Sequence, residues 1–165
     1  MKGFLVRMKA LLVLYVVWLA LMAPLSTQDL AVGLGIVLVL VLLPLPGLSI
    51  YREISLAPKR ILFFILYIGV LLIEICKSNI DVALRVVQPV IPIQPGIVKV
   101  STRLTSRLGR WVLANSITLT PGTITVETKG GDLYIHWISV TADDVDSATK
   151  KIVNQFEKYL EVIFG

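Results

Sequence analysis

The 165-residue chain is 56% hydrophobic and only 16% charged, with a formal net charge of +5. Ordinary soluble domains carry roughly 25% charged residues, so this composition argues against a fully soluble protein. The positive charge is too small and diffuse to indicate nucleic-acid binding, and it fits anionic lipid or an acidic protein surface better. A single cysteine, Cys76, excludes an intrachain disulfide and a cysteine-based metal cluster.

Two apolar stretches in the N-terminal half predict two membrane helices. Residues 10–28 and 30–50 contain no charged side chain. An apolar run of about 17–25 residues is long enough for a helix to span a bilayer. We therefore predict spans at about 8–25 and 28–45, with Ser26 placed to cap the second helix.

The third apolar segment is expected to form the longest helix. Pro58 suits the first turn of a helix, and the next proline in the chain is Pro89. A helix of about 30 residues, about 45 Å long, fits between them and exceeds the hydrocarbon thickness of about 30 Å. We predict a third span at about 58–76, continued by an amphipathic extension to residue 88. Residues 1–88 would then form the transmembrane region.

Polar residues form a stripe along the second half of this predicted helix. Their spacings of three and four place them on one face, and neighbouring charges alternate in sign: Glu74, Lys77, Asp81, Arg85 and Gln88. The stripe could belong to an ion route, or it could be the polar face of a helix that lies on the membrane surface or on a neighbouring subunit. Glu74 lies about 24 Å along the helix from Pro58, near the far interface, which favours the second interpretation.

A small α+β domain is predicted after a proline-rich linker. The linker covers residues 89–95 and the domain residues 96–165. Alternating apolar residues and turn signals predict the order β-α-β-β-α, with strands at 96–103, 123–128 and 133–140, a helix opened by Ser106 and a last helix from Thr141 to about Phe164. Thr120-Pro121-Gly122 is typical of a type II turn, and Gly130-Gly131 of a hairpin. The predicted fold class is therefore a membrane α-helical region of three hydrophobic helices, the third one long, plus this small domain.

No residue pattern predicts catalysis or cofactor binding. His136 is the only histidine, and no acid or second ligand lies at a spacing that would make a catalytic triad or a metal site. The glycines at residues 122–131 are not followed by the Gly-Lys-Ser/Thr of a phosphate-binding loop. We expect no enzyme activity, no cofactor and no metal ion.

One segment points to a family. Residues 111–123 read Trp-Val-Leu-Ala-Asn-Ser-Ile-Thr-Leu-Thr-Pro-Gly-Thr and are followed by Ile-Thr-Val. This sequence closely resembles the signature of the MrpE/MnhE family, the E subunits of Mrp-type multisubunit Na+/H+ antiporters, and the layout of nearly the whole chain is similar. Archaeal membrane-bound hydrogenases and sulfane sulfur reductases contain the same antiporter module, with a small subunit of the same form.

The resemblance implies a non-catalytic accessory subunit in the cell membrane. Its partners would be the lipid bilayer and the other membrane subunits of an Mrp-type antiporter or hydrogenase-type complex, with no nucleic acid. The resemblance also implies that the subunit does not bind redox centres, is not the main proton-conducting channel and has a cytoplasmic C-terminal domain. A stand-alone small transporter and a membrane-tethered binding module that uses the basic region 99–110 are the alternatives.

The polar residues of the signature segment have two compatible interpretations. Their side chains satisfy backbone groups where a helix ends and a strand begins, or they form a docking surface for neighbouring subunits. Together with the stripe, they give the candidate subunit-interface residues Glu74, Lys77, Asp81, Arg85, Asn115, Thr118, Thr120, Pro121 and Gly122.

Charge does not decide the orientation in the membrane. Six basic residues lie before the third predicted span or at its start, and six others follow it within 35 residues: Lys2, Arg7, Lys9, Arg52, Lys59 and Arg60, and then Lys77, Arg85, Lys99, Arg103, Arg107 and Arg110. If all three segments cross, the two groups lie on opposite sides and the positive-inside rule gives no preference. The short first two segments could instead form an incomplete hairpin.

Overall fold

The computed structural model describes residues 2–22, 24, 26–43 and 46–165, which fall into two compact units divided between Ile54 and Ser55. We call them the N-terminal unit and the C-terminal unit, and each is described by itself. The predicted ends of the first two spans, residues 25 and 44–45, lie outside the described residues. This division differs from the predicted one at 89–95, because the long third helix packs against helices of the small domain.

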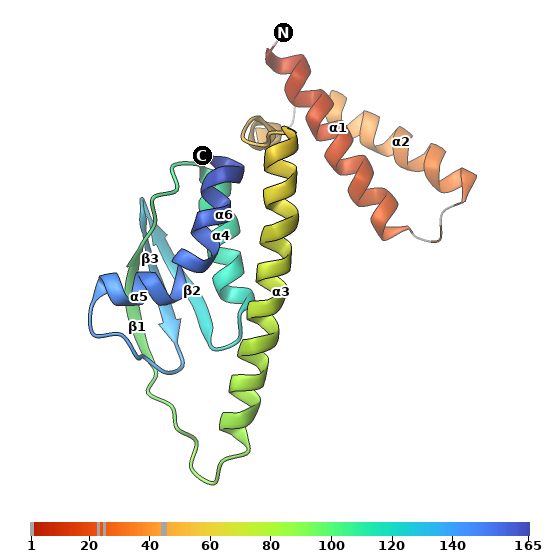
Figure 1. The fold of residues 1–165 in the computed structure, drawn as a ribbon. Helices are drawn as coiled ribbons and strands as arrows, with labels where there is room; N and C mark the ends of the chain where they lie inside the picture. The colour runs from red at the N-terminus through yellow and green to blue at the C-terminus, as the bar shows by residue number, and fades with distance from the viewer. Residues whose placement is uncertain (1, 23, 25, 44–45) are drawn as a thin grey trace. The chain divides into compact units, whose positions relative to one another are not determined.

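The N-terminal unit is a helical hairpin followed by a 3-10 helix. Its elements are α1 (Lys2–Leu21), α2 (Thr27–Leu42) and η1 (Pro46–Arg52) (Figure 1). α1 begins earlier than the predicted span, because the basic residues at its start continue the helix. Among them, the Lys9 ammonium donates to the carbonyl oxygen of Ile54 at 2.6 Å. The start of α1 is thereby tied to the end of this unit.

Contacts near the turn hold α1 and α2 together. The indole Nε1 of Trp18 donates to the carbonyl oxygen of Asp29 at 2.9 Å. Gly33 lies directly against the same indole, where a Cβ atom has no room. The absence of a side chain at Gly33 therefore permits close approach of the two helices. At the turn itself, Ser26 caps α2 as predicted and forms a capping box with Asp29.

Most apolar side chains of the N-terminal unit are exposed. Its buried core consists of Ala10, Val37 and Val41. Within the described residues, two helices are long and apolar enough to cross a membrane, Gly3–Leu21 and Pro58–Val86. α2 has 16 residues, about 24 Å, which is short against a hydrocarbon core of about 30 Å. Length and composition therefore support two crossing helices and do not confirm the predicted three.

The C-terminal unit joins the long helix α3 (Pro58–Val86) to a small α+β domain. The domain has a three-stranded antiparallel sheet with the order β1-β3-β2. The bounds of its elements are β1 (Gly96–Ser101), α4 (Arg107–Leu119), β2 (Thr123–Lys129), β3 (Asp132–Trp137), α5 (Val145–Ile152) and α6 (Asn154–Phe164). The predicted turn glycines Gly122 and Gly130 both have positive φ, +92° and +61°.

The core of this unit lies between one face of the sheet and the helices. Alternate residues of β1 and β3 are buried there, among them Val100, Leu133 and Ile135, and they belong to one cluster with Phe156 and Leu160 of α6. A strand places every second side chain on one face, and the other face of this sheet leaves apolar residues such as Ile97 and Ile124 exposed.

α3 packs along α6 and α4 (Figure 1). Tyr67 is almost completely buried, and its hydroxyl forms a hydrogen bond with the hydroxyl of Ser116 on α4. The rings of Phe63 and Tyr159 lie 6.4 Å apart, centroid to centroid. At the start of α3, the Arg60 guanidinium donates to the carbonyl oxygen of Ile163 at 3.1 Å and caps the end of α6.

The third strand is shorter than predicted, because the chain changes its partner after Trp137. The backbone N–H of Ile138 donates to Gly122 in the turn at 2.8 Å, and that of Val140 donates to Gln94 in the linker at 2.9 Å. Residues 138–140 therefore pair with the turn and the linker. The first strand likewise ends at Ser101, before the predicted residue 103.

The predicted last helix is two helices, so the element order is β-α-β-β-α-α. The helical axis is interrupted at Val153, where the N–H of Phe156 donates to the Val153 carbonyl oxygen at 3.0 Å in a 3-10 pattern. The first of the two begins one turn later than predicted. Asp144, and not Thr141, is its N-cap, because the Asp144 carboxylate accepts from the N–H of Ser147 at 2.7 Å.

Candidate functional site

The four charged residues of the polar stripe form two ion pairs, as their spacing predicted, whereas Gln88 follows the end of α3. The Lys77 ammonium lies 2.8 Å from the Glu74 carboxylate, and the Arg85 guanidinium lies 2.7 Å from the Asp81 carboxylate. Arg85 also donates to the carbonyl oxygen of Pro92 at 2.9 Å, which ties the linker to the helix. Glu74, Asp81 and Arg85 lie on the helix face that turns toward the α+β domain, and Lys77 lies at the margin of this face.

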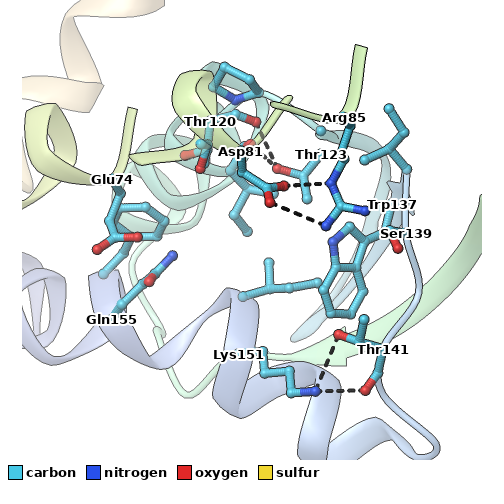
Figure 2. A pocket seen from close by; sticks show the side chains of 17 residues that line it. Glu74, Asp81, Arg85, Thr120, Thr123, Trp137, Ser139, Thr141, Lys151 and Gln155 are labelled. Atoms are coloured by element: carbon cyan, nitrogen blue, oxygen red, sulfur yellow. Dashed lines mark hydrogen bonds and ion pairs between the residues drawn. The ribbon is translucent and has the colours of Figure 1, made fainter. Parts of the chain in front are cut away.

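A cleft of about 250 Å³ lies between this face and the domain (Figure 2). Its walls come from the second half of α3, the turn between α4 and β2, the segment after β3, and the adjoining parts of α5 and α6. The polar and charged residues that line it are Glu74, Ser78, Asp81, Arg85, Thr120, Thr123, Ser139, Thr141, Lys151 and Gln155. Ile117, Ile152, Phe156 and Trp137 supply most of its apolar lining.

The turn that forms one wall is held rigidly by local hydrogen bonds. The Thr123 hydroxyl donates to the carbonyl oxygens of Ile117 at 2.6 Å and Thr120 at 3.0 Å. At Gly122 the backbone is left-handed, and a Cβ atom would come within 3.0 Å of the Ile138 side chain. The left-handed backbone conformation therefore favours glycine here, and a Cβ atom would in addition require the Ile138 side chain to shift.

The opposite wall is tied together by Lys151 of α5. Its ammonium donates to the Thr141 carbonyl oxygen at 2.6 Å and lies 3.2 Å from the Thr141 hydroxyl (Figure 2). At the other end of the cleft Gln155 and Glu74 both face the cavity (Figure 2). The cleft thus offers fixed charges of both signs beside amide and hydroxyl groups. Such a lining suits a polar protein surface that carries complementary charges.

His136 is not among the lining residues of the cleft. It lies in the middle of the sheet, opposite Ile97 on one side and Ile124 on the other. In the part of the chain that the structure describes, no group of three or more His, Cys, Asp or Glu side chains is placed to hold a metal ion.

Comparison with known proteins gives the chain its family. Residues 11–163, nearly the whole sequence, match the family MNHE, described as Na+/H+ ion antiporter subunit. The chain belongs to this family. The resemblance found in the signature segment around Thr120-Pro121-Gly122 is thereby confirmed.

Individual members of the MNHE family are similar over most of their length. The E subunit of the Na+/H+ antiporter of Alkalihalophilus pseudofirmus is 30% identical over 149 residues, which are 89% of this chain and 90% of the relative. The E1 subunit of the Na+/H+ antiporter of Staphylococcus aureus is 31% identical over 157 residues, 87% of this chain and 92% of the relative. A chain in the structure of the membrane-bound sulfane sulfur reductase, an archaeal respiratory membrane complex, is 42% identical, with a TM-score of 0.82 over 96% of this chain and 99% of that chain.

The cleft of this MNHE family member brings together most of the predicted interface residues. Those that line it are Glu74, Asp81, Arg85, Thr120, Pro121 and Gly122. Lys77, Asn115 and Thr118 do not belong to the lining. Lys77 is exposed at the margin of α3, and the other two lie on α4 outside the cleft. The predicted set therefore divides into a cleft group and a flanking group.

The polar side chains of the signature segment bind backbone groups, as the first interpretation predicted. Asn115 donates to the Trp111 carbonyl oxygen, Thr118 to that of Ala114 and Thr120 to that of Ser116, each at 2.9 Å. These are bonds to the residue four positions earlier, which polar side chains make within helices. The Thr118 hydroxyl also accepts from the N–H of Thr125 at 3.1 Å and so joins α4 to β2.

Sequence reasoning missed Lys151, Gln155 and Trp137 as lining residues. Lys151 and Gln155 belong to the polar side of the single helix that the sequence predicts, and only the apolar side of that helix entered the prediction. The spacing of four between them is the local signal that they share a face, but nothing local shows that this face turns toward α3.

Proposed function

We propose that this chain is a non-catalytic accessory subunit of a multisubunit Mrp-type cation/proton antiporter module. In this role it supports assembly and ion translocation by neighbouring subunits. The observation that carries the proposal is the family match over residues 11–163. The composition of the cleft fits this role, since two of its carboxylates are already paired within the chain, Glu74 with Lys77 and Asp81 with Arg85.

The cleft and its flanks are the proposed contact surface for a neighbouring subunit. Glu74, Asp81 and Arg85 would present paired charges to the partner, and the turn at Pro121-Gly122 would supply a rigid edge. The side chains of Lys77, Asn115 and Thr118 would extend the contact beyond the cleft. A partner surface with charges of both signs would find complementary groups at fixed positions, which favours specificity over raw affinity.

The subunit is further proposed to be a multi-pass protein of the cell membrane, held there by its apolar helices, with the α+β domain on the cytoplasmic side. The exposed apolar side chains of α1, α2 and α3 support the membrane location. No cofactor or metal ion takes part in this proposal. The chain would contribute shape and surface, while conduction takes place in its neighbours.

A second host complex is favoured by one specific observation. The 42% identity and the nearly complete coverage relate this chain to a subunit of a membrane-bound sulfane sulfur reductase, an archaeal respiratory membrane complex. An antiporter module built into such a respiratory complex would use the same small subunit in the same supporting role.

Gentle detergent extraction followed by identification of the co-purifying chains tests the proposal. We expect large membrane subunits of an antiporter, and redox subunits in addition if the host is a respiratory complex. The purified chain alone in liposomes is expected to produce no ion flux. Flux by the isolated chain, or extraction of the chain without any partner under conditions that keep other membrane complexes intact, would contradict the proposal.

A further inference from the structure

The helix α3 has two faces of different character. The face toward the domain carries Phe63, Tyr67 and Leu71 in its first half and the ion pairs of the stripe in its second half. The opposite side, which we call the outward face, is formed by apolar residues that are each at least 46% exposed: Ile61, Leu62, Ile65, Leu66, Leu72, Ile73, Ile80 and Leu84. In the C-terminal unit, nothing covers this face along α3 (Figure 1).

The inward face is docked on a polar domain from the first turn onward. Arg60 caps α6 and Phe63 contacts Tyr159, whose ring lies 5.0 Å from the ammonium of Lys158. A turn further along, Tyr67 meets Ser116 of α4. If α3 crossed the bilayer in this packed arrangement, charged residues of α6 such as Lys158 would enter the hydrocarbon beside it. Charges at that depth are costly and need a partner or water.

The length of the outward face also disagrees with a perpendicular crossing. From Ile61 to Leu84 it extends about 35 Å at 1.5 Å per residue, whereas the hydrocarbon core is about 30 Å thick. A crossing helix would therefore have to tilt away from the membrane normal to bury this apolar face completely. A helix in the plane of the membrane can bury the whole face at one depth, about 5–10 Å into the boundary between headgroups and acyl chains.

We propose that α3 lies in the plane of the membrane surface, with its outward face against lipid and the α+β domain on its aqueous side. The inference rests on the membrane location given in the proposed function. The occupant of the outward face is lipid, whose acyl chains match side chains without a single charge between Ile61 and Ile73. Lys59 at the start of α3 and Lys77 at its margin can reach anionic headgroups with their long side chains.

The distribution of basic residues supports this arrangement independently. Residues 53–57 connect η1 directly to α3, so α3 begins on the membrane side where η1 ends. If α1 and α2 cross and α3 stays on that side, all 16 Lys and Arg residues lie on one side of the membrane, because residues 10–51, which include α2 and the turn before it, contain none. The two groups of six basic residues then no longer lie on opposite sides of the membrane, and the positive-inside rule places both in the cytoplasm.

Labelling of single cysteines in native membrane vesicles tests the proposal. In a Cys76→Ser background, Lys59→Cys marks the start of α3 and Lys150→Cys marks the domain; both lysines are exposed, so folding is expected to be unaffected. A membrane-impermeant maleimide should label both cysteines in inside-out vesicles, and both signals should be lost together in right-side-out vesicles. The Cys76→Ser chain without a further cysteine is the control for background labelling. Labelling of the two positions from opposite sides would overturn the proposal.

Nitroxide labels on the outward face test the occupant. In the assembled complex, labels at Ile65, Leu72 and Ile80 should show the same shallow depth, with access to dissolved oxygen and partial access to a water-soluble nickel chelate. A depth that passes through the bilayer centre between Ile65 and Ile80 would show a crossing helix. Loss of access to both reagents would show that a protein partner covers the face. Either result would overturn lipid contact in the plane, whereas a failure to co-purify subunits would affect only the proposed function.

Discussion

Tyr67 of α3 and Ser116 of α4 join their hydroxyl groups in a buried hydrogen bond between residues 49 positions apart in the chain. The Ser116 hydroxyl donates to the carbonyl oxygen of Val112 at 2.7 Å, so the phenol of Tyr67 is the donor in the bond between the two side chains. This bond connects the apolar helix α3 to the helix that carries the signature segment.

Removal of the acceptor should cost more stability than removal of the donor. In Tyr67→Phe the Ser116 hydroxyl keeps its bond to Val112, so a loss of about 1 kcal/mol is expected, the net value of one hydrogen bond. In Ser116→Ala the buried phenol is left without its acceptor, which costs about 1–3 kcal/mol. Thermal unfolding of the full chain in detergent measures both, with Tyr134→Phe as a control in the sheet. Equal effects of the two substitutions would contradict the assignment of donor and acceptor.

The carboxylate of Glu157 fixes the loop after β1, and its removal should destabilise the domain. The side chain is 3% exposed and accepts from the Thr102 hydroxyl at 2.5 Å and from the Arg103 N–H at 2.8 Å. Glu157→Ala leaves these partly buried donors without their acceptor, so we expect a loss of about 1–3 kcal/mol of unfolding free energy. Glu161 pairs with the same arginine on the surface, and Glu161→Ala should cost under about 1 kcal/mol. A similar loss in both variants would show that the ion pairs of the Arg103 guanidinium stabilise the domain, and not the bond from the Arg103 backbone N–H to Glu157.

The parts of the fold that the sequence predicts well depend on neighbouring residues. The Ser26 cap, the turn at Gly122 and the ion pair of Glu74 with Lys77 all involve partners at most four positions apart. Such contacts follow from helix and turn geometry alone, so spacing is enough to infer them. The family signature was readable for the same reason, since it is one continuous segment.

The parts that could not be predicted depend on packing between distant elements. Phe63 and Tyr67 lie in a run of apolar residues that looks lipid-facing, and only the folded unit shows that they bind α4 and α6. The cleft needs Lys151 and Gln155 to meet α3, a contact that no local pattern contains. The break at Val153 is also tertiary, because it lets α5 and α6 both bury their apolar sides in one core.

Replacement of Gly122 should release the domain from its partners. Gly122→Val forces a branched side chain into a left-handed backbone conformation and against Ile138, so a cost of at least about 1–3 kcal/mol is expected from strain alone. Gly130→Ala is a matched control: its φ is also positive, but a Cβ there meets open space. Co-purification yield of the assembled complex is the measurement. Normal assembly of the Gly122→Val subunit would show that the turn is not required.

Stability of the domain should fall in acid. The Lys99 ammonium, and then the Ser101 hydroxyl, lower the pKa of Asp132 below its ordinary value of 3.8, and the N–H and hydroxyl of Ser147 lower that of Asp144. The folded state therefore binds fewer protons at these carboxylates than the unfolded state near pH 4. Their stabilisation is complete above that range and is lost as the pH falls through the lowered pKa values.

Unfolding temperatures between pH 7 and pH 3 measure this contribution. Asp132→Asn should flatten the acid part of the profile, because the pair with Lys99 can no longer be titrated. An Asp132→Asn profile that matches the unsubstituted chain would contradict the role of this ion pair.

Glu74→Gln should impair assembly more than it alters transport. Glu74 pairs with Lys77 and lines the cleft that we propose as a subunit contact, and it lies in the second half of α3, away from the middle of any crossing. Loss of its charge removes one half of the ion pair and weakens the complementarity to a partner. Complex that does assemble should therefore pump at nearly the normal rate per complex. Glu127→Gln, which also breaks a surface ion pair but lies outside the cleft, should leave both yield and rate unchanged. Fully assembled Glu74→Gln complex that no longer pumps would place this carboxylate on the ion route and disprove its assignment to the interface.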